Sequence, residues 1–409
     1  MAIALRVFVP FASIYLLAYV LRVVNAVAGE PISVELGLSA ADLGFLTSVY
    51  LAGFALCQLP FGILMDRYGP RKVEAATLLL AVAGCAVFAV AQGFAGLVVG
   101  RVLMGVGASM CLMAPFTAYR KWFTPEKLPL VVGLHMACGG LGSALGGLPT
   151  EVLMAAVGWR GLFAILAGLV FLGAAAILFV VPAKREPAEI QSFGLMTREL
   201  AAVLKSRALW RVAPLAATTQ AGFLGVIGLW TGPWLRDVAQ LSPAVAAAWL
   251  SAAAVGLIVG FFGYGVLASR AERSGRAMDV FVWGTVLFAG VAVAIIVLPP
   301  AVGTPLWILY AALGSGGVLT YAILTRAFSE GLAGRVNTTL NFLVFFFAFL
   351  TQWAFGVVLE FFPSLTGTGA GSRTGYQVAM VLLLVVQGLS YLPLLLRPAP
   401  AAGAPVKST

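Results

Sequence analysis

Arg22 is a charged residue inside a long apolar stretch, where a charge is costly and usually marks a functional site. Tyr15, Tyr19 and Arg22 follow one another at i, i+4 and i+7, so they share one face of a helix, and Asn25 lies one turn beyond. A guanidinium beside hydroxyl and amide groups can hold a small organic anion. Neutral polar partners for such a substrate come from the second half of the chain, where we single out Gln220, Tyr310 and Asn341.

Glu151 is a carboxylate well inside another apolar stretch, and Arg101 lies at a similar depth in a third. We expect Glu151 to pair with Arg101 or with Arg22. A neighbouring arginine favours the charged carboxylate, whereas loss of water favours the protonated acid. A glutamate that alternates between these surroundings can therefore carry a coupling proton. A purely structural ion pair is the alternative interpretation of the same residues.

A second constellation consists of soft metal ligands around the single histidine of the chain. Thioether, thiol and imidazole groups suit Cu(I), so copper transport is a hypothesis. Against it, adjacent residues point about 100° apart on a helix, so these side chains cannot all converge. Packing is the simpler interpretation, and the weak candidates for metal ligands are Met110, Cys111, His135 and Cys138.

Membrane-spanning helices must position all these residues. Hydrophobic residues make up 61% of the chain and charged residues 10%, which is too apolar for a protein that dissolves in water. A helical span needs about 20 apolar residues, and no segment alternates as the strands of a β-barrel do. The sequence predicts an all-α integral membrane protein with twelve transmembrane helices. Their expected bounds are 5–28, 40–64, 73–93, 95–119, 128–156, 161–182, 209–234, 243–268, 279–299, 304–327, 335–361 and 375–397.

Positive charge is concentrated in alternate loops. The formal net charge is +10, yet 20 of the 25 Lys and Arg residues fall on one side when the N-terminus is placed inside. The positive-inside rule explains this distribution, and nucleic-acid binding does not. We expect both termini to be cytoplasmic in a bacterial-type inner membrane. Ala26-Val27-Ala28 could be read as a signal cleavage site, but Arg22 interrupts the apolar run, so we expect the first helix to be retained.

A tight charged turn joins the second and third predicted helices. It reads Gly62-Ile-Leu-Met-Asp66-Arg67-Tyr-Gly69-Pro-Arg71-Lys72, and it resembles the loop at this place in the major facilitator superfamily. The stretch Arg101-Val-Leu-Met-Gly105-Val-Gly107-Ala108 is similar to the helix-4 arginine motif of the same family, which is often linked to proton transfer. The resemblance implies two pseudo-symmetric six-helix bundles.

The same resemblance implies a conformational latch that holds the two halves together in the outward-open state. Its residues are Gly62, Asp66, Arg67, Gly69 and Arg71. We expect Asp66 to lie at the N-terminus of helix 11, around residues 335–339, whose unpaired N–H groups favour a nearby carboxylate.

The chain is expected to contain an N-terminal bundle at 1–182, a cytoplasmic linker at 183–208, a C-terminal bundle at 209–397 and a disordered cytoplasmic tail at 398–409. A weaker copy of the charged turn, Gly265-Val-Leu-Ala-Ser269-Arg270, begins 203 positions after the first, which is close to half the chain. Ser269 stands where the carboxylate would be. The mirror latch is therefore expected to be weaker.

These features predict a secondary active transporter that takes up a small organic anion or amphiphilic metabolite with protons by alternating access. Efflux of drugs or metabolites by proton antiport is the alternative, although Pro149 follows Leu148 where exporters of the resembled family have a Gly-Pro pair. No enzyme activity and no cofactor are expected, because the sequence has no Walker phosphate loop, and no dinucleotide fingerprint or nucleophile elbow outside a span. The expected partners are the substrate, protons and the lipid bilayer, without nucleic acid.

Overall fold

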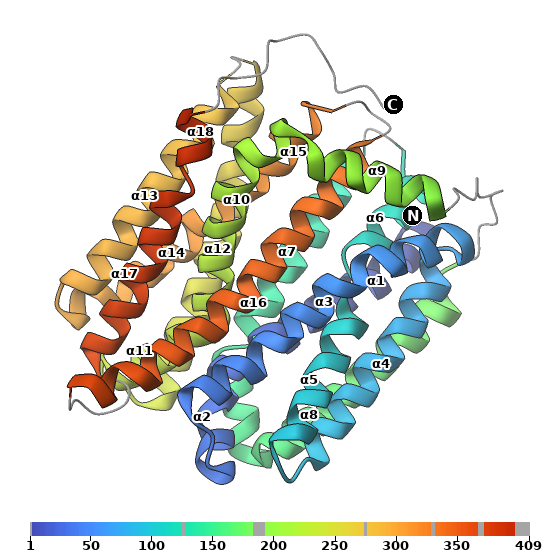
Figure 1. Ribbon diagram of the computed structural model, residues 1–409. Helices are drawn as coiled ribbons and strands as arrows, with labels where there is room; N and C mark the ends of the chain where they lie inside the picture. The colour runs from blue at the N-terminus through green and yellow to red at the C-terminus, as the bar shows by residue number, and fades with distance from the viewer. Residues whose placement is uncertain are drawn as a thin grey trace.

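The computed structural model describes residues 2–124, 127–182, 193–273, 276–328, 332–366 and 372–396, and these are almost entirely helical (Figure 1). The first half contains α1 (Ala2–Val23), α2 (Asn25–Leu36), α3 (Ala40–Tyr68), α4 (Pro70–Val90), α5 (Phe94–Ala108), α6 (Met113–Trp122), α7 (Leu128–Leu145) and α8 (Leu148–Val180). After α9 (Phe193–Lys205), the second half contains α10 (Arg207–Gly225), the π-helical turn η1 (Val226–Trp230), α11 (Thr231–Asp237), α12 (Pro243–Arg273), α13 (Ala277–Val297), α14 (Pro300–Gly314), the 3-10 turn η2 (Ser315–Val318), α15 (Leu319–Thr325), α16 (Ala333–Thr366), α17 (Arg373–Leu389) and α18 (Leu392–Leu396).

The predicted set of membrane helices is confirmed, although several helices are interrupted. Eleven of the described helical stretches are long and apolar enough to cross a membrane, and Leu130–Leu145 is a shorter apolar helix. The predicted fifth helix breaks between α7 and α8, and α8 joins the end of that helix to the sixth at Gly158. The φ of Gly158 is 70°, a left-handed conformation that glycine adopts without a Cβ clash. The fifth and sixth helices therefore meet at a single glycine.

The two halves pack against each other through two pairs of helices, α3 with α16 and α7 with α12 (Figure 1). Within the first half, α7 lies so close to α1 that an added Cβ at Gly142 would stand 2.1 Å from the Leu16 carbonyl oxygen. At the break after α7, the Ser251 hydroxyl of α12 accepts a hydrogen bond from the Leu148 N–H (2.9 Å) and donates one to the Ala144 carbonyl (2.8 Å). The second half thus satisfies backbone groups that the break leaves free.

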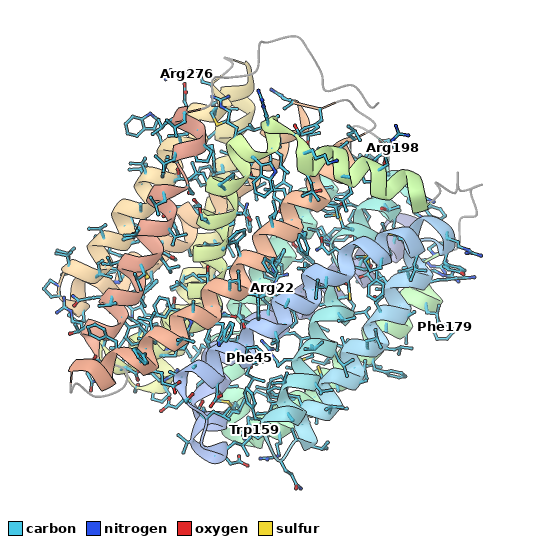
Figure 2. All side chains as sticks on the ribbon, viewed as in Figure 1. Arg22, Phe45, Trp159, Phe179, Arg198 and Arg276 are labelled. Carbon is cyan, nitrogen blue, oxygen red and sulfur yellow. The ribbon has the colours of Figure 1, made fainter. Side chains whose placement is uncertain are left out.

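Large apolar side chains cover the outside of the bundle, as contact with lipid requires. Phe179 on α8 is 79% exposed and Phe262 on α12 is 76% exposed, and Figure 2 shows Phe179 at the outer edge of the molecule. Arg198 and Arg276 lie at one end, which we call the basic end (Figure 2). There α1 begins, α18 ends and α9 runs across the helix ends (Figure 1). The other end, which contains α2 and α11, is called the opposite end.

The predicted linker at 183–208 is described only from residue 193 onward, and it contains α9. An ion pair between Arg335 Nε and Glu199 Oε2 (3.1 Å) connects α16 to α9. The tail predicted to be disordered at 398–409 lies outside the described residues.

Candidate functional site

Arg22 lies near the middle of the molecule, between the two halves (Figure 2). Its guanidinium carbon stands 4.5 Å from the centre of the Tyr19 ring, 5.2 Å from that of Phe54 on α3 and 5.1 Å from that of Phe345 on α16. The Phe54 and Phe345 ring centres are 4.4 Å apart, so each half supplies one wall. We call Tyr19, Phe54 and Phe345 the aromatic cage, whose ring faces attract the cation.

No carboxylate neutralises Arg22 in the described part of the chain. The ion pairs found there join Arg160 with Glu35, Arg236 with Glu30, Arg276 with Asp279 and Arg335 with Glu199. Arg22 Nε also has no hydrogen-bond partner. Cation–π contacts offset only part of the cost of removing a guanidinium from water. An anion that entered the cage would supply both the missing charge and an acceptor for Nε.

Three other predicted substrate residues lie at or across the interface between the halves. Tyr15 and Tyr19 stay beside Arg22 on α1, with their hydroxyl oxygens 3.4 Å apart. Asn341 of α16 donates a hydrogen bond to Gln58 of α3 (2.6 Å). Because this bond crosses from one half to the other, any motion that separates α3 from α16 must break it.

The remaining predicted substrate residues lie apart from the aromatic cage. Asn25 donates to the Thr47 hydroxyl (3.0 Å) within the first half. Tyr310 donates to the Gly222 carbonyl (3.3 Å) and packs within the core of the second half. Gln220 Nε2 is buried and has no hydrogen-bond partner, so it is the one of the three that keeps a free donor.

Arg101 on α5 is completely buried, and it contacts the backbone near the break between α1 and α2. Its Nη1 donates to the Leu21 carbonyl (2.8 Å), next to Arg22, and its guanidinium carbon lies 5.1 Å from the centre of the Tyr50 ring. The helix is interrupted at Val24, so an arginine can take a carbonyl at this point. Arg101 therefore positions the segment that carries Arg22.

Glu151 lies in the first turn of α8, and it forms no ion pair with Arg22 or Arg101 in the described chain. The charged groups that act on it are Arg236 and Glu30, both near the opposite end. The expected pair is thus missing from this structure, because the break after α7 starts a new helix that brings Glu151 near these groups. The proton site at Glu151 stays a prediction.

Contact between α2 and α11 closes the opposite end. Arg236 pairs with Glu30 (2.6 Å) and donates to the Ala26 carbonyl (3.3 Å). An added Cβ at Gly232 would stand 2.2 Å from the same Ala26 carbonyl oxygen, so the two helices touch backbone to backbone. Glycine at this position permits a closure that a side chain would prevent.

We expect Gly232→Leu to hold the opposite end open, because the added side chain collides with the α2 backbone. Distances between spin labels on α2 and α11 in lipid would be longer than in the wild type. Gly290→Leu is the control, since a Cβ there meets nothing within 4 Å and the residue is exposed. Equal distance distributions in Gly232→Leu and the wild type would contradict this closure.

The candidate metal ligands make other contacts in the structure. Both ring nitrogens of His135 are engaged, Nδ1 with the Tyr119 hydroxyl (3.0 Å) and Nε2 with the Cys111 carbonyl (3.3 Å). Met110 is buried in a small apolar cluster. Among the described residues, no group of three His, Cys, Asp or Glu side chains could hold a metal ion. The geometry favours the packing interpretation.

Two hydrogen bonds show that α3 and α16 run antiparallel, and they indicate where Asp66 lies relative to α16. The Ala41 N–H donates to Glu360 (3.1 Å), and seventeen residues further along α3, Gln58 accepts from Asn341. Continued by about two helical turns, this register brings the backbone of Asp66 opposite the first turn of α16. The Asp66 side chain lies outside the described part of the structure, so the latch stays a prediction.

The other predicted latch residues are placed at the basic end of α3 and α4. Arg71 donates to the Val181 carbonyl (2.9 Å), and Arg67 lies over the Tyr68 ring at 5.3 Å. Gly69 has a φ of 81°, which the tight turn between these helices requires. A Cβ at Gly62 would meet nothing within 4 Å.

Sequence reasoning missed Glu74, a carboxylate on α4 that is completely buried. It follows Arg71 and Lys72 and lies just inside the third predicted span, so its position suggests a residue at the membrane surface. The packing of the 109–122 segment over α4 buries it instead. The signal available in the sequence was a carboxylate inside the bounds of a predicted span.

Two helical halves with a charged residue between them are typical of a membrane carrier. A profile of the Major Facilitator Superfamily matches residues 11–352, and the chain belongs to this superfamily. It is a transporter and not an enzyme. A solved structure with the same fold is a bacterial homologue of the human lysosomal transporter Spinster, in an inward-facing and unoccupied conformation. It superposes with a TM-score of 0.75 at 18% identity, covering 95% of this chain and 96% of that one.

Curated relatives are similar over shorter segments. The chain is 29% identical to "Probable anion transporter 2, chloroplastic" of Oryza sativa subsp. japonica, over 54% of this chain and 41% of that protein. It is 32% identical to a probable sulfoacetate transporter of Cupriavidus necator, over 39% and 37%. It is 34% identical to the tetracenomycin C resistance and export protein of Streptomyces glaucescens, over 36% and 29%. The matched segments span less than half the length of each of these relatives.

Proposed function

We propose that the protein is a secondary active transporter that takes up a small organic anion together with protons. We further propose that it lies in an inner membrane with both termini in the cytoplasm. The observation that carries the proposal is Arg22, a guanidinium enclosed by the aromatic cage between the halves and unpaired with any described carboxylate. A half-buried charge without a counter-ion between the two halves suits a site that its ligand completes.

The comparisons support the substrate class, since two of the similar proteins are named for anions and sulfoacetate. Orientation is supported by the excess of Lys and Arg at the basic end. Alternating access is supported by the interface itself. The halves touch backbone to backbone at the opposite end, and glycine and ion-pair contacts of this kind can part without unfolding either bundle.

A ligand panel tests the anion assignment. Purified protein is heated with sulfoacetate, with mono- and dicarboxylates and with organic amines, because a ligand that binds the folded form raises the midpoint of unfolding. We expect an anion to raise the midpoint. Arg22→Lys should weaken its binding by about tenfold or more, since lysine loses the planar two-pronged donor set. Arg276→Lys, at an exposed arginine, is the control and should bind as the wild type does.

Efflux of drugs by proton antiport is the second candidate, favoured by the similarity to the tetracenomycin C export protein. The same panel separates the two functions. Stabilisation by amines or neutral aromatic compounds, with binding indifferent to Arg22→Lys, would overturn the anion proposal and favour efflux.

A further inference from the structure

Glu74 is an acidic side chain enclosed on every side by the first half of the molecule. Its exposed fraction is 0%. Neither carboxyl oxygen has a hydrogen-bond partner. The residue before it, Val73, belongs to an apolar cluster with Met110 and Ala114, against which Phe61 and Met65 pack. A carboxyl group without donors and without water is rare in a folded protein.

The groups around Glu74 supply no positive charge among the described residues. The titratable groups that face it are the Cys111 thiol and the Tyr119 hydroxyl, both from the segment over α4. Four arginines of the helices packed against it contact other groups, and Lys72 of α4 and Arg120 of α6 are exposed. Arg71 of α4 donates to Val181, Arg101 of α5 donates to Leu21, Arg160 of α8 pairs with Glu35, and Arg67 of α3 lies over Tyr68.

The protonation state follows from these surroundings. An ionised carboxylate in an apolar site, with neither a donor nor a counter-ion, is strongly unfavourable, and such a group takes up a proton instead. The neutral acid is tolerated beside a thiol and apolar side chains. These surroundings therefore favour the protonated form of Glu74 in this conformation, out of contact with water.

A chain of contacts connects Glu74 to the anion site. The Cys111 backbone carbonyl meets His135 Nε2 (3.3 Å) in the interruption between α5 and α6. The His135 ring stacks on Tyr15, with ring centres 4.2 Å apart. The Tyr15 hydroxyl reaches Tyr19, which belongs to the aromatic cage around Arg22. A shift of the 109–112 turn that admits water to Glu74 can therefore be transmitted to Tyr19 in the aromatic cage.

We propose that Glu74 is the site that binds the coupled proton. The carboxylate takes a proton from water that enters from the opposite end when the 109–112 turn shifts. It is a neutral acid while the 109–122 segment packs over it, and it gives the proton to water at the basic end when that segment moves away. This proposal deepens the proposed function, on which its coupling role rests, and it places the proton at a residue other than Glu151.

Infrared spectroscopy of the full protein in lipid tests the site with the proton alone as the ligand, so no substrate is needed. At pH 7 the wild type should show the C=O stretch of a protonated carboxyl group that exchanges slowly in D2O. Glu74→Gln should lose that band, and Glu151→Gln should keep it. A band that survives in Glu74→Gln would overturn the proposal. If the wild-type spectrum shows no protonated carboxyl group at pH 7, that spectrum alone overturns the proposal.

Uptake into proteoliposomes then tests coupling, with the anion that stabilises the protein most in the panel. Glu74→Gln should keep exchange of that anion but lose accumulation driven by a pH gradient, whereas Glu151→Gln should accumulate it. The reverse result would assign the proton to Glu151. If no anion binds, the proposed function fails while the infrared result still decides the proton site.

Discussion

Asp66→Asn should strongly slow uptake while the protein still folds. The register of α3 and α16 brings the backbone of residue 66 opposite the first turn of α16, where unpaired N–H groups attract a carboxylate. An interaction of this kind contributes roughly 0.3–2 kcal/mol. Its loss should shift the ratio of the two conformations by about 2- to 30-fold towards the state that is open at the basic end.

Distances between spin labels on α6 and α15 measure that ratio, and anion uptake measures the consequence. Asp279→Asn is the control, because Asp279 is another aspartate at the basic end, but it lies in the first turn of its own helix α13 and pairs locally with Arg276. Wild-type distances and wild-type uptake in Asp66→Asn would remove the latch from the mechanism.

Gly105→Ala should destabilise the first half, although alanine favours a helix. An added Cβ at Gly105 would stand 2.0 Å from the Tyr50 carbonyl oxygen, so α5 and α3 would have to move apart. Overpacking of this kind costs about 1–3 kcal/mol, more than the roughly 1 kcal/mol that alanine gains over glycine in a helix. Thermal unfolding of the purified protein should show a lower midpoint.

The matched control for this effect is Gly168→Ala on α8, where a Cβ meets nothing within 4 Å. Its midpoint should be unchanged or higher, since only the helix propensity changes. Because Tyr50 lies beside Arg101, Gly105→Ala should also weaken anion binding. If both variants unfold at the same temperature, the close approach of α3 and α5 does not limit stability.

The fold could be predicted because lipid imposes a strong and local rule. Every span needs a run of apolar residues, and every loop on one side attracts Lys and Arg. The breaks were harder to foresee. The sequence holds many glycines, and nothing local distinguishes Gly158, which turns the chain, from Gly142, which admits a neighbouring helix.

The candidate site was predictable where residues share one helix. The face with Tyr15, Tyr19 and Arg22 follows from helical periodicity alone, and the structure keeps these residues together. Contacts between helices were not predictable, because a helix that is apolar on all sides does not reveal which face meets the other half. Tyr310 therefore lies in the core of the second half, and Glu74 was overlooked beside two basic residues.

The position of Arg22 also ties the carrier to the voltage across the membrane. A unit charge that crosses the whole potential changes in energy by about 2.3 kcal/mol for each 100 mV. The empty carrier holds an uncompensated guanidinium between its halves, whereas a bound monovalent anion cancels that charge. The electric field therefore acts on the Arg22 charge while the anion site is empty and not while an anion fills it, so voltage shifts the balance between the two conformations of the carrier without anion.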